Sequence, residues 1–256
     1  MEISVLLLSY ISLLGFILGF VVCKTNFCTM GAVSDWVNIG DLSRFKSWMF
    51  AAAIAIIGVT VFEFMSYIDL DDSRIPYRNS VFLWPRYILG GIMFGIGMTY
   101  ASGCGNKVLI RVGGGNLKSI VVLLVAGLMA YIMTRTDFYG IIFHSWMNPI
   151  SPDLAKFGID DQSLPTILSS ITTSSNTVYY KLLIGLLTGL TFLYYIFRSG
   201  SFIKNIDNMI GGFVVGSVVV LAWYLTGSSL GAEWIETNNF LDTPLPGVGV
   251  QSFTFI

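Results

Sequence analysis

The stretch Tyr100-Ala-Ser-Gly-Cys-Gly-Asn-Lys-Val-Leu-Ile-Arg111-Val-Gly-Gly-Gly is a polar, glycine-rich interruption between two segments that are apolar enough to cross a bilayer. In hydrocarbon the backbone must satisfy its own hydrogen bonds, so irregular chain at membrane depth occurs only where it is buried in protein or lines a water-filled path. Because this interruption carries Cys104, the sequence predicts that a thiol lies on a permeation route.

The rest of the chain has the composition of a membrane protein. Hydrophobic residues make up 54% of it and charged residues 11%, and the mean hydropathy is +0.74. Runs of roughly 20 apolar residues are long enough to span a bilayer. Six such runs are present, at residues 3–23, 47–65, 86–103, 117–134, 179–197 and 209–231. We therefore expect an all-α fold, a polytopic integral membrane protein with about six spanning helices.

The charge pattern excludes some functions and predicts an orientation. The net charge is −1 and the basic residues are scattered, so neither a nucleic-acid surface nor a basic membrane-adhesion patch is indicated. The connections after the first, third and fifth spans hold eight Lys and Arg residues, against six in the remaining segments. Since cytoplasmic loops carry an excess of these residues, we expect a multi-pass protein of the inner (plasma) membrane with its N-terminus outside the cytoplasm.

The three cysteines do not have the spacing of a disulfide framework or of a redox pair, so free thiols are expected. An internal repeat links two of them. In each unit two glycines four residues apart stand 13 and 9 residues before the cysteine: Gly15 and Gly19 before Cys28, and Gly91 and Gly95 before Cys104. Glycines at this spacing let helix backbones approach closely, and repeated units that meet at a central site are common in transporters.

These motifs resemble those of a known family. Phe27-Cys28 follows a glycine-spaced first helix, and Ser102-Gly103-Cys104 is followed by Arg111 and by glycines at 113–115. The combination is similar to that of the YeeE/YedE sulfur-transport family, whose members take up thiosulfate or related sulfur species. The resemblance covers most of the chain. It implies a helical membrane protein with short re-entrant helices at the cysteine-bearing breaks. It also implies that cysteines from repeated motifs form a relay through the centre, with Cys28 and Cys104 matching two of them.

The chain also departs from the family pattern. Lys24 stands where members often have an arginine, Ser102 stands where they have a second glycine, and no cysteine follows Cys104. The resemblance further implies a TusA-like cytoplasmic sulfur carrier as a partner that receives the product. Besides that carrier, the expected partners are a small sulfur-containing anion and membrane lipids.

The chemistry of a thiol suits such an anion. Thiosulfate is divalent and has a soft terminal sulfur, and a neutral S–H group is a weak donor in a small side chain. Weak contacts permit conduction because the ion must be admitted and then released. A thiolate would repel the anion, so we expect protonated thiols at Cys28 and Cys104. Helix N-termini directed at the breaks would add positive potential.

Other residues near the breaks have both a functional and a structural interpretation. Lys107 and Arg111 are either anion-attracting residues or cytoplasmic anchors, and Cys23 is either part of the pathway or a packing residue. We expect Gly103 and the glycines at 113–115 to provide backbone freedom for tight turns. The candidate pathway residues are Cys28, Cys104, Gly103, Gly105, Arg111, Lys107 and Cys23. These glycines are not a nucleotide loop, because no Gly-Lys-Ser/Thr follows them. We expect no resident metal and no cofactor.

The chain divides into three parts. Residues 1–134 form the first half of the membrane domain with both cysteine units, 135–178 form a polar linker with a short interfacial helix, and 179–256 form a second half. A third glycine pair, Gly185 and Gly189, opens this second half, but no cysteine break follows and the chain ends apolar at Ile256. We therefore expect an incomplete second half, or closure by oligomerisation, with an open flank beside Cys104 lined by the later helices.

Three function classes compete. Transport of thiosulfate or a related small sulfur compound is favoured. A soft-metal transporter of the copper type is the second, because Cys23, Cys28, Cys104 and nearby methionines could bind Cu(I). A membrane scaffold subunit without transport is the third. No acid–base pair or nucleophile–histidine arrangement indicates an enzyme.

Overall fold

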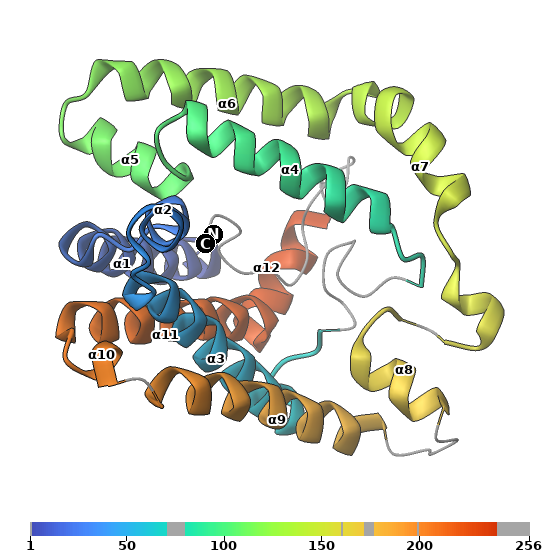
Figure 1. The fold of residues 1–256 in the computed structure, drawn as a ribbon. Helices are drawn as coiled ribbons and strands as arrows, with labels where there is room; N and C mark the ends of the chain where they lie inside the picture. Colours follow the sequence, from blue (N-terminus) through green and yellow to red (C-terminus); the bar gives the residue numbers. More distant parts are fainter. Residues whose placement is uncertain (1, 71–79, 160, 172–176, 199, 240–256) are drawn as a thin grey trace.

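The computed structural model describes residues 2–70, 80–159, 161–171, 177–198 and 200–239, and within these ranges the chain is helical (Figure 1). The elements are α1 (Glu2–Thr25), α2 (Thr29–Ile39), α3 (Ser43–Phe64), α4 (Trp84–Tyr100), α5 (Gly105–Gly113), α6 (Leu117–Arg135), a π-helical turn η1 (Gly140–His144), α7 (Ser145–Ile150), a 3-10 turn η2 (Leu154–Phe157), α8 (Leu164–Ile171), α9 (Thr177–Phe197), α10 (Gly200–Ile203), α11 (Ile206–Gly227) and α12 (Ser229–Asn239). The predicted all-α fold class is confirmed.

Among the described residues, six helical segments are long and apolar enough to cross a membrane, which confirms the six predicted spans. Two of the six are broken helices: α1 continues into α2, and α4 continues into α5. The second pieces have 11 and 9 residues. At about 1.5 Å per residue neither crosses a hydrocarbon core of about 30 Å alone. The breaks between the pieces carry Cys28 and Cys104, as the sequence pattern predicted.

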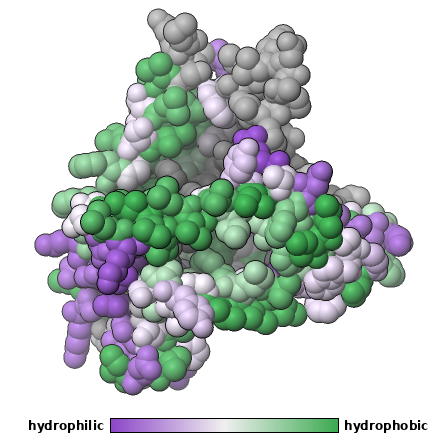
Figure 2. All heavy atoms as spheres, turned by 90° about the horizontal axis from the view of Figure 1, so that it is seen from above, coloured by the Kyte–Doolittle hydropathy of each residue, from purple (hydrophilic) through white to green (hydrophobic). Residues whose placement is uncertain are grey.

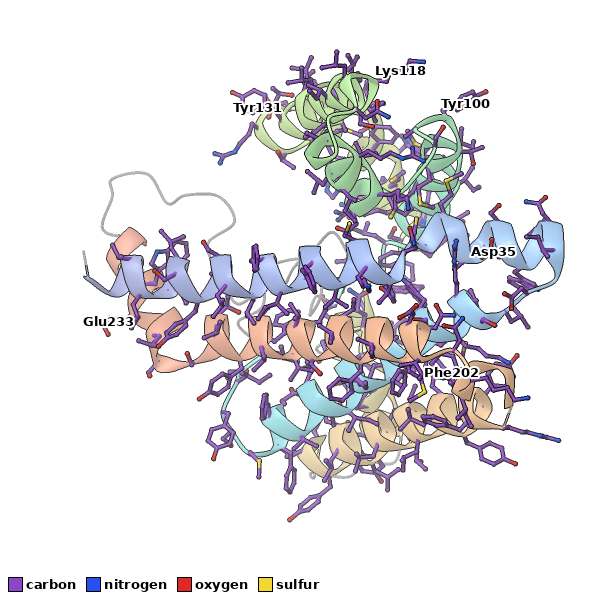
Figure 3. All side chains as sticks on the ribbon, turned by 90° about the vertical axis from the view of Figure 1, so that its left-hand side faces the viewer. Asp35, Tyr100, Lys118, Tyr131, Phe202 and Glu233 are labelled. Atoms are coloured by element: carbon purple, nitrogen blue, oxygen red, sulfur yellow. The ribbon has the colours of Figure 1, made fainter. Side chains whose placement is uncertain are left out.

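The helices form layers on either side of α1 and α2. In Figure 3 the α4–α6 unit, which carries Tyr100, Lys118 and Tyr131, lies on one side of the α1–α2 layer, and α11 lies on the other. Helix α3 packs against both α9 and α11. Val22, Phe27, Ala51 and Val215 form a buried apolar cluster, and Ile110 of α5 packs against it. This cluster joins both cysteine units to the larger helix layer.

Glycine contacts explain why the later helices pack on α3. A Cβ placed at Gly216 of α11 would lie 2.6 Å from the backbone oxygen of Ala51, and one at Gly189 of α9 would overlap Ile57. Such contacts show that the backbones approach as closely as glycine allows. In the described part of the chain α9 and α11 pack on α3 and Cys104 is buried, so the flank lined by these helices that we expected beside Cys104 is not seen there.

The α4–α6 unit keeps large apolar faces exposed. Leu124 and Leu128 of α6 and Phe94 of α4 are each more than half exposed. Figure 2, which views the molecule from above α6, shows hydrophobic side chains along this face and hydrophilic ones gathered toward its sides. Exposed apolar helices of this length are what a bilayer accommodates.

The segment expected to be a linker with one short helix contains four short elements, η1, α7, η2 and α8. Its middle is tied to the start of α4, because the Phe82 N–H donates to the Pro152 carbonyl and the Leu154 N–H donates to the Ser80 carbonyl, each at 3.0 Å. The apolar C-terminal tail, on which the incomplete-half prediction depends, lies outside the described residues.

Candidate functional site

The two cysteine breaks have the same backbone geometry. The residue two positions before each cysteine lies in the left-handed region, with φ of 53° at Asn26 and 57° at Ser102. Each cysteine then has an extended backbone and is the N-cap of the short helix that follows it. The repeat seen in the sequence therefore corresponds to a repeated local structure: helix, left-handed kink, cysteine and helix.

The two breaks bring the cysteines into contact. The sulfurs of Cys28 and Cys104 lie 3.5 Å apart, close enough for one thiol to donate a hydrogen bond to the other. Both residues are free and buried, at 8% and 6% exposure. A second link joins the breaks, because the Lys107 ammonium donates to the Asn26 side-chain oxygen at 3.0 Å. Residues 76 positions apart thus form one paired-thiol centre.

Both short helices begin at this centre. The first N–H groups of a helix have no intrahelical partner, and the helix dipole places positive potential there. Helices α2 and α5 start at Thr29 and Gly105, directly after the two cysteines. The paired thiols therefore sit where two helix N-termini meet, a setting that favours negative charge.

We expected Gly103 to provide backbone freedom for a tight turn, and this reason was wrong. The left-handed residue of the second break is Ser102, whereas Gly103 does not have a positive φ. Gly103 instead gives Lys107 room, because a Cβ there would lie 2.9 Å from the Lys107 Cβ. The turn after α5 does need glycine, since Gly115 has φ of 82° and the Asn116 N–H donates to the Arg111 carbonyl.

The other predicted pathway residues lie on the helices around this centre. Gly105 is exposed at the start of α5, and Arg111 is half-buried in the last turn of α5. Cys23 is exposed on α1 and does not join the thiol pair. The functional roles of these residues stay predictions.

A second group beside Cys28 was not apparent from the sequence. Arg44 of α3 forms an ion pair with Asp35 of α2, with 3.3 Å between its Nε and the carboxylate. Arg44 shares a narrow pocket with Cys28 and with Asn208 of α11. The sequence gave little indication of this group. Arg44 is one of several basic residues beside a predicted span. Asn208 falls just before another predicted span, where an asparagine is typical of a helix cap.

Comparison with known proteins supports the resemblance of the motifs. The sequence profile of the family described as "Sulphur transport" matches residues 24–252. The chain belongs to this sulphur-transport family. The match includes both cysteine breaks, so the paired-thiol centre lies within the matched region.

Two relatives of this chain are described as thiosulfate transporter TsuA. The protein from Escherichia coli (strain K12) is 26% identical over 127 residues, which are 50% of this chain and 34% of the relative. The protein from Spirochaeta thermophila is 33% identical over 119 residues, 46% of this chain and 34% of the relative. The aligned part thus spans about a third of the length of either relative.

Proposed function

We propose that this protein moves thiosulfate or a related small sulfur anion into the cytoplasm along a path that passes Cys28 and Cys104. The observation that carries the proposal is the buried contact of 3.5 Å between the two sulfurs, each supplied by one copy of the repeated break. The family match and the two relatives described as thiosulfate transporters support the substrate class.

The transport step is non-covalent. Two protonated thiols offer weak S–H donors and polarizable sulfur surface to an anion whose terminal sulfur is itself soft. The N-termini of α2 and α5 contribute positive potential at the same point. Because each contact is weak, the anion is held long enough to pass from one thiol to the next and is not trapped. No step requires a cofactor.

The surroundings of the thiol pair suit an anion. Lys107 lies one helical turn after Cys104, and its ammonium is held toward the first break by Asn26. Arg111 lies one further turn along α5. We infer that these basic side chains attract the anion, and that a TusA-like carrier receives the product on the cytoplasmic side, which the positive-inside pattern places after α2 and α5.

Uptake of radiolabelled thiosulfate tests the proposal. A host that cannot otherwise grow on thiosulfate as its sulfur source should grow when the full chain is expressed, and its cells should accumulate the label. Growth and uptake equal to those of an empty-vector strain would contradict thiosulfate transport.

A soft-metal transporter is the second candidate, because two adjacent thiols are a ligand pair that Cu(I) accepts. Among the residues that the structure describes, no group of three His, Cys, Asp or Glu side chains converges on one point. Copper-dependent growth and copper uptake, measured in the same strains, discriminate between the two candidates. A strain that gains neither activity favours the scaffold alternative.

A further inference from the structure

A narrow pocket lies beside Cys28, between α2, α3 and α11. It is lined by Phe27, Cys28, Arg44, Ser47, Trp48 and Asn208. The space among these side chains is nowhere wide enough for a water molecule. A small ion therefore enters only when one of the lining side chains moves aside.

Arg44 is the charged residue among those that line the pocket. Its side chain is 39% exposed and lies over Gly31, where an added Cβ would be 2.8 Å from the Arg44 Nη1 and 3.6 Å from the Cys28 Cβ. Only glycine at this position lets the guanidinium come so close to the cysteine. The ion pair to Asp35 uses its Nε, and a guanidinium has four further N–H donors.

Asn208 provides the second observation. The residue is 7% exposed, its backbone N–H donates to Asn205, and its carbonyl accepts from the Ser47 hydroxyl at 2.6 Å. Its side chain lines the pocket, so its amide can donate to a ligand there. An amide N–H₂ group offers two hydrogen-bond donors. A ligand that accepts hydrogen bonds is a suitable partner for it.

We propose that this pocket is an anion subsite that binds the oxygen-bearing end of thiosulfate through the Arg44 guanidinium and the Asn208 amide, with the terminal sulfur toward Cys28. The inference rests on the proposed function and adds a residue set to it. An oxyanion matches the forked donors of arginine, and the amide N–H₂ group adds a donor from another helix. The thiol matches the soft sulfur.

Asp35 then acts as a built-in competitor. Its carboxylate already occupies one face of the guanidinium, and its side chain is 23% exposed. Asp41 adds a second negative charge in the turn between α2 and α3, because hydrogen bonds from Ser43 lower the pKa of the Asp41 carboxyl and keep it ionised. These carboxylates weaken the hold of Arg44 on an incoming anion and so favour release. Figure 3 shows Asp35 on α2, at the opposite end of the molecule from Glu233 of α12.

The test measures thiosulfate uptake by the full chain in proteoliposomes as a function of concentration. Arg44→Gln and Asn208→Asp should each raise KM by about tenfold, the loss expected for one hydrogen bond to a charged group. Arg44→Lys should raise KM less, because the charge remains. Asp35→Asn should lower KM, because it removes the competing carboxylate.

A purely structural ion pair would not give opposite changes in KM for the Arg44 and Asp35 variants. If the pair only supported the fold, its loss through either residue would have the same effect on KM. Arg198→Gln is the matched control, because Arg198 is an exposed arginine just after the end of α9 that does not line the pocket, and its KM should not change. If Arg44→Gln does not accumulate in the membrane, Arg44→Lys and Asn208→Asp, which preserve side-chain size more closely, test the subsite in its place.

A second measurement separates this inference from the proposed function. Thiosulfate should raise the Tm of the purified wild-type protein, and Asn208→Asp should abolish that rise. The subsite would be overturned if Arg44→Gln and Asn208→Asp both took up thiosulfate with the KM of the wild-type protein. It would also be overturned if Arg44→Gln and Asp35→Asn changed KM in the same direction and by the same amount. A wild-type protein that binds thiosulfate at this pocket but does not transport it would overturn the proposed function alone.

Discussion

The α1–α2 unit and the α4–α5 unit share one local structure but differ in what surrounds them. Each unit has a basic side chain packed over a glycine near its cysteine: Arg44 over Gly31 in the first unit and Lys107 over Gly103 in the second. Arg44 is paired with a carboxylate, whereas Lys107 donates to the neutral amide of Asn26. The same motif thus gives two equivalent sulfurs with unequal electrostatic surroundings.

The units also differ in packing. The glycine pairs of both units are open, with nothing within 4 Å of a Cβ added at Gly15, Gly19, Gly91 or Gly95. The first unit packs against α3 and α11, whereas α5 of the second unit packs mainly against α6. The repeat therefore determines where the two sulfurs lie. The neighbouring helices determine the charge around each cysteine and how tightly each unit is packed.

The most severe test of the paired-sulfur arrangement removes one sulfur at a time. We expect Cys104→Ala to reduce thiosulfate uptake to the level of an empty vector, because it removes an S–H donor and its polarizable sulfur while changing little volume. Cys104→Ser, which retains a donor but loses the soft sulfur, should be strongly impaired, and Cys28→Ala should match Cys104→Ala. Expression and membrane insertion, measured by immunoblotting of membranes, should stay normal. Wild-type uptake in Cys104→Ala and Cys104→Ser would refute the relay.

The unequal charges predict graded effects along α5. Lys107→Gln should lower uptake several-fold, because its ammonium lies at the junction of the two breaks and makes a charge-assisted hydrogen bond there. Arg111→Gln, one turn further away, should lower uptake less without abolishing it. Initial uptake rates at low thiosulfate concentration measure both. Normal rates in Arg111→Gln would return Arg111 to the role of a membrane anchor.

The difference in packing predicts opposite signs for the same substitution. Gly216→Ala should destabilise the protein by about 1–3 kcal/mol, because its Cβ would lie 2.6 Å from the Ala51 carbonyl oxygen and a backbone atom cannot turn away. Gly91→Ala should be neutral or stabilising by up to about 1 kcal/mol, because its Cβ meets open space and alanine favours helix. Thermal unfolding in one detergent compares the two. Equal melting temperatures would show that α11 and α4 are packed alike.

The smallest expected effect distinguishes the two kinks. Ser102 has φ of 57°, a conformation that costs a residue with a Cβ roughly 1–2 kcal/mol, so Ser102→Gly should stabilise the fold by about 1 kcal/mol. Asn26→Gly should not stabilise it, because asparagine tolerates this region and its side chain accepts the Lys107 hydrogen bond. Melting temperatures of both variants, with unchanged uptake in Ser102→Gly, are the measurement. A lower Tm for Ser102→Gly would contradict the strain at this position.

Much of the fold follows from local properties of the chain. The six spans and the two breaks were predictable because the transfer of a helix into a bilayer depends on its own side chains and on roughly 20 consecutive residues. The repeated spacing of glycines and cysteines likewise indicated that Cys28 and Cys104 occupy equivalent positions in two similar units. A tight turn at the second break was also predictable, but we expected Gly103 to provide it, whereas the residue with a positive φ is Ser102.

The contacts of the site were not predictable in this way. The sulfur contact joins residues 76 positions apart, and the Ser47 hydroxyl reaches the Asn208 carbonyl across 161 positions. These pairs depend on which helices lie side by side, and that choice depends on close glycine contacts of α9 and α11 with α3. Hydropathy places a helix in the membrane but does not distinguish among its possible neighbours, because lipid and protein are similarly apolar. The membrane spans and the cysteine breaks were therefore determined by the sequence alone, whereas the pairing of the thiols and the Arg44 pocket arise only when the helices pack.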